Sequence, residues 1–256
     1  MKRFSLGTIL CLSLLAAKGG AQQAPWPVNS LERPRPPVIR PGAPVPSTPP
    51  PSDAIVLFDG TGLSAWESEE EGKPAVWTVR NGYMEVKPGS GAIQTRRAFG
   101  SIQLHLEWAE PAPPNGEGQH RGNSGVFLMS RYEIQVLDSW RNDTYADGQA
   151  GAMYGQRPPL VNASRPPGAW QSYDIVFIRP RFAPDGSVAS PARVTVFHNG
   201  VVVHDDEAFT GRTVHGRAAT YETHLDRLPL LLQDHGSRVR FRNVWVRELV
   251  DDPGEG

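Results

Sequence analysis

The sequence predicts an all-β domain, built as a sandwich or barrel of short antiparallel strands. Apolar and polar residues alternate with a period of two in several separate runs, which is the pattern of half-buried strands. No stretch longer than about ten residues shows a convincing helical period. Many short strands joined by glycine-rich turns are typical of sandwiches and barrels. We therefore expect one β-domain over residues 52–250, long enough to bury one substantial core.

The clearest predicted strand covers residues 101–108. Leu104 and Leu106 share one of its faces, and His105 and Glu107 share the other. Because successive side chains of a strand point to opposite sides, one face meets the core and the other meets solvent or ligand. The same reasoning predicts further strands over residues 132–138, 171–178, 192–198, 201–204 and 239–247.

Local sequence signals also predict two hairpin turns and one bulge. Asn81-Gly82 and Asn199-Gly200 each lie between strand-like runs, and Asn-Gly favours the two-residue type I′ turn, in which both residues have positive φ. In the last strand the apolar positions change parity between Phe241 and Val244. A change of parity requires one extra residue, so we expect a β-bulge near Asn243.

Residues 1–21 have the composition of an export signal: two basic residues, an apolar run over residues 4–17, and small residues before the expected cleavage point. The alternative is a membrane anchor, but about 14 apolar residues fall short of the roughly 20 that span a bilayer. We predict a cleaved signal and a periplasmic or secreted protein with no transmembrane segment in its mature part.

Residues 22–51 form a proline-rich linker in this interpretation, and residues 251–256 a disordered tail. Eleven prolines lie between residues 25 and 51, and almost no periodic apolar pattern accompanies them. Such a composition favours an extended polyproline-type chain that contributes little to a core. We therefore expect this segment to serve only as a tether for the domain.

Charge and cysteine content exclude several classes of function. Without residues 1–21 the chain has 23 basic and 27 acidic residues, a net charge of −4, and no basic stripe. This balance argues against a nucleic-acid partner. The single cysteine, Cys11, lies inside the predicted signal, so the mature chain has no disulfide, thiol nucleophile or cysteine metal ligand.

Glu133 and Gln135 share the polar face of the predicted strand 132–138, with Asp138 just beyond them. A carboxylate and an amide two positions apart point the same way and are spaced to grip two hydroxyls of one sugar. The alternative is a solvated strand face. The pattern is similar to the Glu-x-Asp-x-x-Glu strand of laminarinase-like glycosidases, but it offers one good carboxylate where glycosidic hydrolysis ordinarily uses two. Hydrolysis here therefore requires a substrate that is already activated.

A second cluster begins with Asp234-His235 at a predicted strand end. An adjacent carboxylate can hold a histidine that acts as acid or base near neutral pH. The alternative is that Asp234 caps a turn and His235 lies at the surface. Arg240 and Arg242 share one face of the following strand and suit the clamping of carboxylates or hydroxyls. Glu107 lies on the polar face of another strand, whose place relative to Glu133 depends on the sheet order.

No metal or cofactor is expected. Residues 143–148 space several oxygen ligands as a calcium loop would, but the rest of an EF-hand, including its terminal glutamate, is missing. The histidines lack metal-ligand spacing. Trp140 and Trp170 flank loops and are better candidates for stacking on a sugar than the tryptophans of the predicted strands.

Taken together, the motifs of the domain resemble the 3-keto-disaccharide hydrolases, a family common in exported bacterial proteins. The residues that carry the resemblance are Leu57-Phe58-Asp59-Gly60, Gly122-Asn123-Ser124-Gly125-Val126-Phe127, Tyr132-Glu133-Ile134-Gln135-Val136-Leu137-Asp138, Gly151-Ala152-Met153-Tyr154-Gly155, Pro166-Pro167-Gly168-x-Trp170-x-x-Tyr173 and Leu232-Gln233-Asp234-His235-Gly236. The resemblance implies a concanavalin-like jelly-roll sandwich of two antiparallel sheets, with the sugar on the concave face of one sheet.

The resemblance also implies a chemistry that one carboxylate can perform. A ketone at carbon 3 of a glycoside acidifies the hydrogen on carbon 2, so one base can start elimination of the aglycone, and addition of water completes a net hydrolysis. In this interpretation Glu133 is the base, and His235, held by Asp234, is the proton donor or second base. The residues expected to hold the sugar are Glu107, Asn123, Gln135, Asp138, Tyr154, Arg240 and Arg242.

Two further expectations accompany this reading. A sugar 3-oxidoreductase in the same pathway is a candidate partner, because the substrate is a ketone. The alternative function is a non-catalytic, lectin-like domain that binds carbohydrate with the same face and the loop tryptophans.

Overall fold

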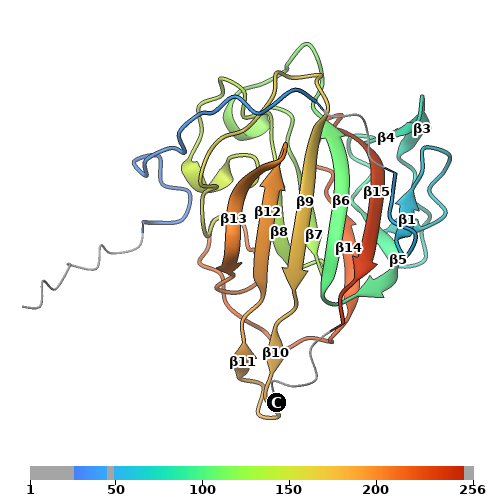
Figure 1. The fold of residues 1–256 in the computed structure, drawn as a ribbon, viewed down its shortest axis with the longest axis vertical. Coiled ribbons are helices and arrows are strands. Elements are labelled where there is room, and N and C mark those ends of the chain that lie inside the picture. The colour runs from blue at the N-terminus through green and yellow to red at the C-terminus, as the bar shows by residue number, and fades with distance from the viewer. Residues whose placement is uncertain (1–25, 45–48, 251–256) are drawn as a thin grey trace, which may run out of the picture.

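The computed structural model describes residues 26–44 and 49–250, which contain an all-β sandwich of two antiparallel sheets (Figure 1). The larger sheet has the order β13-β12-β9-β6-β15-β4-β3, with β1 beside β15. Its strands are β1 Ile55–Phe58, β3 Thr78–Arg80, β4 Tyr83–Glu85, β6 Ile102–Ala109, β9 Gln171–Ile178, β12 Arg193–His198, β13 Val201–Ala208 and β15 Arg240–Glu248. The predicted jelly-roll class is confirmed.

The smaller sheet packs behind the larger one in the order β2-β5-β14-β7-β8 (Figure 1). Its strands are β2 Trp66–Ser68, β5 Ile93–Phe99, β7 Ser124–Leu128, β8 Tyr132–Val136 and β14 Leu228–Leu232. A separate two-stranded ribbon, β10 Arg181–Phe182 and β11 Val188–Ser190, extends from one end of the sandwich. Two 3₁₀ turns, η1 Gly118–His120 and η2 Ala146–Gly148, lie in the connections.

Alternation within each strand separates the core from the outer faces. Leu104 and Leu106 of β6 and Ile175 of β9 are fully buried between the sheets, and Ile134 and Val136 of β8 meet them from the other side. These aliphatic side chains are removed from water on both sides, so their burial supplies the main stabilisation of the fold. The residues between them, including Glu133 and Gln135, therefore point out of the sandwich.

Both predicted hairpin turns and the predicted bulge are present. Asn81 and Gly82 join β3 to β4 with φ of 48° and 77°, and Asn199 and Gly200 join β12 to β13 with φ of 54° and 79°. Asn243 has φ of 47°, and the register between β15 and β6 shifts between Arg242 and Trp245. The parity change in the sequence is therefore a true β-bulge.

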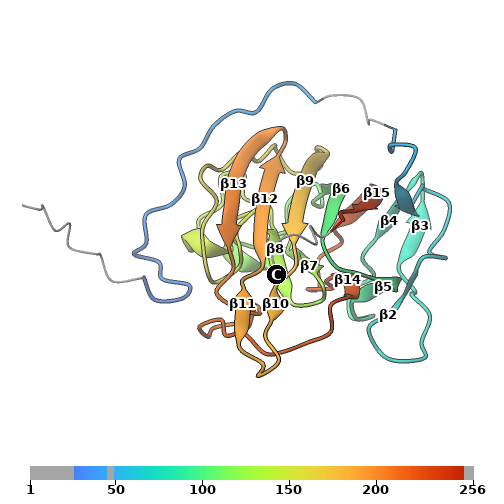
Figure 2. The same cartoon turned by 60° about the horizontal axis from the view of Figure 1, so that its bottom comes forward.

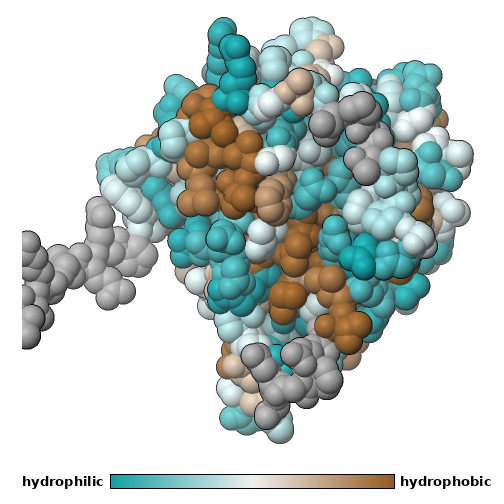
Figure 3. Space-filling model, viewed as in Figure 1, coloured by the Kyte–Doolittle hydropathy of each residue, from teal (hydrophilic) through white to brown (hydrophobic). Residues whose placement is uncertain are grey.

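The outer face of the larger sheet mixes polar with apolar side chains (Figure 3). Val176 and Ile178 of β9 are exposed there, whereas Trp245 of β15 is buried against the ring of His105, with ring centroids 5.3 Å apart. Within residues 26–44 and 49–250, no helix is long and apolar enough to cross a membrane. The expected export signal and the expected tail lie outside the described residues.

Residues 26–44, which we call the strap, correct the expectation of a linker that serves only as a tether. The strap has almost no regular secondary structure, as its prolines predict, but it curves around the β13 edge and one end of the sandwich (Figures 1 and 2). Ile39 N donates to Asn162 O at 3.0 Å, and Asn162 N donates to Pro37 O at 2.9 Å. Composition predicted the extended backbone, but these hydrogen bonds depend on distant residues that composition does not reveal.

Candidate active site

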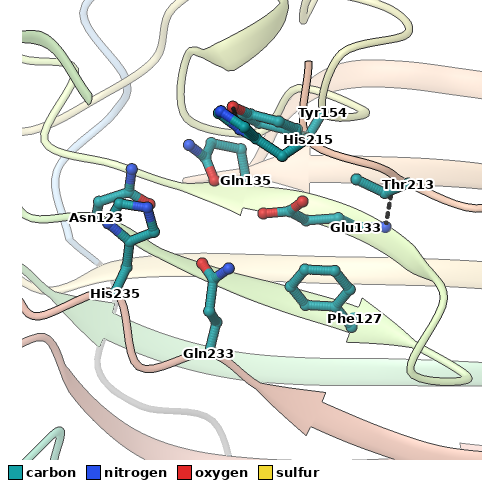
Figure 4. A pocket seen from close by; sticks show the side chains of 9 residues that line it. All are labelled: Asn123, Phe127, Glu133, Gln135, Tyr154, Thr213, His215, Gln233 and His235. Atoms are coloured by element: carbon teal, nitrogen blue, oxygen red, sulfur yellow. Dashed lines mark hydrogen bonds between the residues drawn. The ribbon is translucent and has the colours of Figure 1, made fainter. Parts of the chain in front are cut away.

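A cavity of about 150 Å³ lies on the outer face of the smaller sheet, over β7 and β8 (Figure 4). Strand residues form its floor, and residues from the connections that follow β8, β13 and β14 form its walls. The side chains that line it are Asn123, Phe127, Glu133, Gln135, Tyr154, Thr213, His215, Gln233 and His235. Five of the ten residues predicted for the site are in this set: Glu133, Asn123, Gln135, Tyr154 and His235.

Glu133 is a buried carboxylate that faces the cavity. Only 4% of the residue is exposed, and it forms no ion pair within the described part of the chain. Burial disfavours the charged form and raises the pKa of this carboxyl to about 8. Gly125 on the neighbouring strand makes the position possible, because a Cβ there would lie 2.6 Å from Glu133 Oε1. Glu133 therefore changes protonation state near neutral pH, as a general base must.

Amide side chains surround Glu133 on its own sheet. In the amide orientation that satisfies its neighbours, Gln135 Nε2 donates to Ser124 O at 2.9 Å and to Glu133 Oε1 at 3.2 Å. Asn123 Nδ2 donates to Gln119 O at 2.7 Å. These amides are fixed by their own hydrogen bonds, so they can present neutral donors and acceptors to sugar hydroxyls.

A chain of three hydrogen-bonded side chains leads to the cavity wall above Glu133, where Tyr154 and His215 lie (Figure 4). Tyr145 Oη and Tyr154 Oη lie 2.6 Å apart, and Tyr154 Oη lies 3.0 Å from His215 Nδ1. The rings of Tyr154 and His215 are stacked, with an interplanar angle of 20°. Burial raises the pKa of Tyr154, and the charge of Glu133 adds to this effect, so its hydroxyl stays protonated.

Sequence reasoning missed His215, which it grouped with histidines that lack metal spacing. The residue lies in the irregular connection after β13, where no strand periodicity predicts the direction of its side chain. Tyr154, by contrast, lies within one of the glycine-bounded motifs. The only local signal at His215 is the following Gly216, which has a φ of 66° and marks a turn.

His235 and Asp234 are adjacent in the chain but serve different purposes. His235 lines the cavity beside Asn123 (Figure 4). The carboxylate of Asp234 instead accepts hydrogen bonds from three backbone N–H groups, those of Ser90 at 2.9 Å, Gly91 at 3.2 Å and Gly236 at 2.9 Å. The expectation that Asp234 holds His235 is therefore wrong, because the carboxylate is used to tie two turns together.

Glu107, Arg240 and Arg242 were predicted for the sugar site, but they lie on β6 and β15 of the larger sheet. Glu107 Oε2 accepts from Arg242 Nε at 2.7 Å, and the Arg242 guanidinium lies 4.1 Å from the centre of the Trp170 ring. The Arg240 guanidinium lies 5.5 Å from the centre of the same ring. Strand parity places all three residues on the outer face of the larger sheet, so the core separates them from Glu133.

Asp138 is also outside the cavity. It is 1% exposed and accepts from Arg121 Nε at 2.8 Å and Nη2 at 2.9 Å. Its Oδ1 also accepts from the backbone N–H of Trp140 at 3.1 Å. Asp138 therefore shapes the connection that precedes Asn123, and neither Asp138 nor Trp140 lines the cavity.

The cavity contains one carboxylate and two imidazoles. A glycosidase of the ordinary kind places two carboxyl groups about 5 to 9.5 Å apart around the scissile bond, and among the lining residues Glu133 is the only acid. Within the described residues no group of three histidine, cysteine or acidic side chains is arranged to hold a metal ion. The arrangement suits the removal of one proton by Glu133, whose pKa is near neutral, and the return of a proton by a histidine that lines the same cavity.

Several solved structures resemble this one. A candidate glycosyl hydrolase from Parabacteroides distasonis ATCC 8503, solved at 2.13 Å, is 45% identical with a TM-score of 0.77, and the alignment covers 84% of this chain and 93% of that one. A second protein of that description and organism, solved at 1.70 Å, shares the fold at 20% identity and a TM-score of 0.54, over 77% and 94% of the two chains. No curated protein matches the chain.

The match to a family model is the most direct of these comparisons. It extends over residues 53–247, nearly the whole predicted domain, and includes every residue that lines the cavity. The model describes a 3-keto-alpha-glucoside-1,2-lyase-like domain. This chain belongs to that family.

Proposed function

We propose that this protein is an exported enzyme that cleaves 3-keto-glycosides, with Glu133 as the base that starts the reaction. The observation that carries the proposal is the single buried carboxylate in the cavity, which has no counter-ion in the described residues and a pKa raised to about 8. Family membership and the 45% identical candidate glycosyl hydrolase support action on a glycoside. The composition of residues 1–21 supports export.

The proposed reaction is an elimination followed by hydration. Glu133 takes the proton from carbon 2, and the electrons of that C–H bond delocalise into the carbon 3 ketone. Collapse of the enolate forms the C1–C2 double bond and breaks the bond between carbon 1 and the glycosidic oxygen. Water then adds to carbon 1, and carbon 2 regains a proton, so that the net change is hydrolysis. A separate oxidation at carbon 3 must supply the substrate.

The leaving oxygen needs a proton, and two histidines are candidates to provide it. His215 is held by Tyr154 through its Nδ1, which leaves its Nε2 for the substrate. His235 has no hydrogen bond to its ring within the described residues. We assign the donor to His215, because a ring fixed by a hydrogen bond is oriented before the substrate arrives.

Glu133→Gln tests the base directly. The substitution keeps size and hydrogen bonding but removes proton abstraction, so turnover of a chromogenic 3-keto-glucoside should fall by roughly 10² to 10⁴. Glu110→Gln is the matched control, because burial also raises the pKa of the fully buried Glu110, which does not line the cavity. Near-normal turnover in Glu133→Gln would reject the assignment. A lectin-like domain would instead retain the ligand and release no aglycone in any variant.

A further inference from the structure

The strap is fixed to the connection that carries Tyr154 of the cavity wall and its hydrogen-bond partner Tyr145. This connection, residues 143–156, contains η2, Tyr145 and Tyr154. Arg35 pairs with Asp143 at its beginning, at 2.5 Å, and Arg33 Nη1 donates to Gln156 O at its end, at 3.5 Å. The strap therefore contacts both ends of the segment that forms the wall.

The central contact is the side chain of Asp147, which has no exposed surface. Its Oδ2 accepts from the backbone N–H of Asn29 at 3.0 Å and lies 3.8 Å from Arg33 Nη1. Within the described part of the chain, both partners of this carboxylate come from the strap. A buried carboxylate without donors or a counter-charge is strongly unfavourable, so Asp147 can stay in place only while the strap is in place.

Asp147 is in turn coupled to Tyr154. The backbone N–H of Gly155 donates to Asp147 O at 2.9 Å, so the residue after Tyr154 is tied to the residue that the strap holds. Gly155 has φ of 69°, and a Cβ there would lie 3.3 Å from Val28 Cγ1 of the strap. The strap backbone and side chains thus pack directly against the turn that presents Tyr154 to His215.

We propose that Arg33 and the backbone of Asn29 are positioning groups for the Tyr145–Tyr154–His215 chain, acting through Asp147. The strap is then a part of the enzyme and not a tether. The catalytic half of this inference rests on the proposed function. A displacement of the Tyr154 hydroxyl by about 1 Å would release His215, and errors of that size reduce turnover by up to about 10²-fold.

The experiment compares Arg33→Ala with Arg40→Ala in the full chain. Arg40 is the matched control, because it is an exposed arginine of the same strap with no ion pair in the described residues. Hydrogen exchange measured by mass spectrometry should show at least about tenfold faster exchange over residues 145–156 in Arg33→Ala alone, with β6 and β9 unchanged. The kcat for a 3-keto-glucoside should fall about tenfold or more in the same variant.

Two additional variants separate positioning from general stability. Arg33→Lys keeps the cation and should restore most of the protection and turnover. Asp147→Asn placed in the Arg33→Ala background should add little to the loss of protection and turnover, because both substitutions remove the same Arg33–Asp147 interaction. Exchange over residues 145–156 that is the same in Arg33→Ala and Arg40→Ala would overturn the inference. Faster exchange without turnover in any variant, wild type included, would support the strap contact and reject the proposed function instead.

Discussion

Replacing Glu133 by Gln should make the domain more stable, and the gain should grow with pH. The pKa of this carboxyl is about 8 in the folded protein and about 4.5 in an unfolded chain. The folded state therefore binds a proton that the unfolded state releases between these two values. The stability that goes with the protonated carboxyl is fully present below pH 4.5 and is lost as the pH rises toward 8.

The size of the effect follows from the shift. A difference of 3.5 pH units corresponds to about 5 kcal/mol in the free energy of unfolding once the pH exceeds 8. Linkage gives a loss of about 1 kcal/mol at pH 5 and about 4 kcal/mol at pH 7.5. Gln does not ionise, so the Glu133→Gln variant should escape this loss. Any packing difference between the two side chains is independent of pH and adds a constant.

Urea denaturation at pH 5 and pH 7.5 measures the prediction. The difference in unfolding free energy between variant and wild type should increase by about 3 kcal/mol from pH 5 to pH 7.5, with unchanged m-values. Comparing the two proteins at each pH cancels the contribution of every other titrating group. A difference that stays constant across this range would mean that Glu133 titrates normally, and the assignment of this residue as a near-neutral base would fail with it.

Two other substitutions at the cavity and a test with a chelator probe how Glu133 and His215 are positioned and whether a metal ion takes part. Gly125→Ala places a Cβ 2.6 Å from Glu133 Oε1 and 2.8 Å from Phe127 Cε2, so we expect turnover to fall at least about tenfold as the carboxylate moves, and the melting temperature to fall as well because the Phe127 ring must shift. Tyr154→Phe removes the hydroxyl that lies 3.0 Å from His215 Nδ1, and a kcat reduced about tenfold with unchanged KM is the expected result. Prolonged dialysis against EDTA should leave both melting temperature and turnover unchanged, and a loss that Mn²⁺, Zn²⁺ or Ca²⁺ restores would reveal a metal requirement.

The sequence predicted the strands and turns well because their signals are local. The alternation of Leu104 and Leu106 with polar neighbours follows from the geometry of one strand and needs no knowledge of the rest of the fold. The same is true of the bulge at Asn243, which appears as a change of parity. Glu133 and Gln135 were assigned to one face of one strand by this rule, and the structure places both in the cavity.

The sequence did not predict the placement of residues that depends on contacts between distant parts of the chain. Glu107 has the correct parity for an outward-facing residue, but parity does not say which sheet its strand joins, and β6 lies in the sheet without the cavity. Adjacency in the chain predicts that Asp234 holds His235, whereas the Asp234 carboxylate accepts from the backbone N–H of Ser90, 144 residues away in the sequence. Composition predicts the extended backbone of the strap but not its contact with the domain, because Asn29 N donates to Asp147 Oδ2 across 118 residues of sequence.

The burial of Glu133 both destabilises the fold and makes the carboxylate a stronger base. A carboxylate exposed to water has its ordinary pKa of about 4.5 and is a weak base toward a carbon acid. Burying Glu133 against strand neighbours, without a counter-charge, raises its basicity and destabilises the fold above pH 5. A second acid in the cavity would add repulsion, and a paired cation would restore the ordinary pKa. The lone carboxylate thus fits the 3-keto substrate that we propose, because a substrate activated by its own ketone needs one base, whereas an unactivated glycoside would find no second carboxylic acid in the cavity to protonate its leaving group.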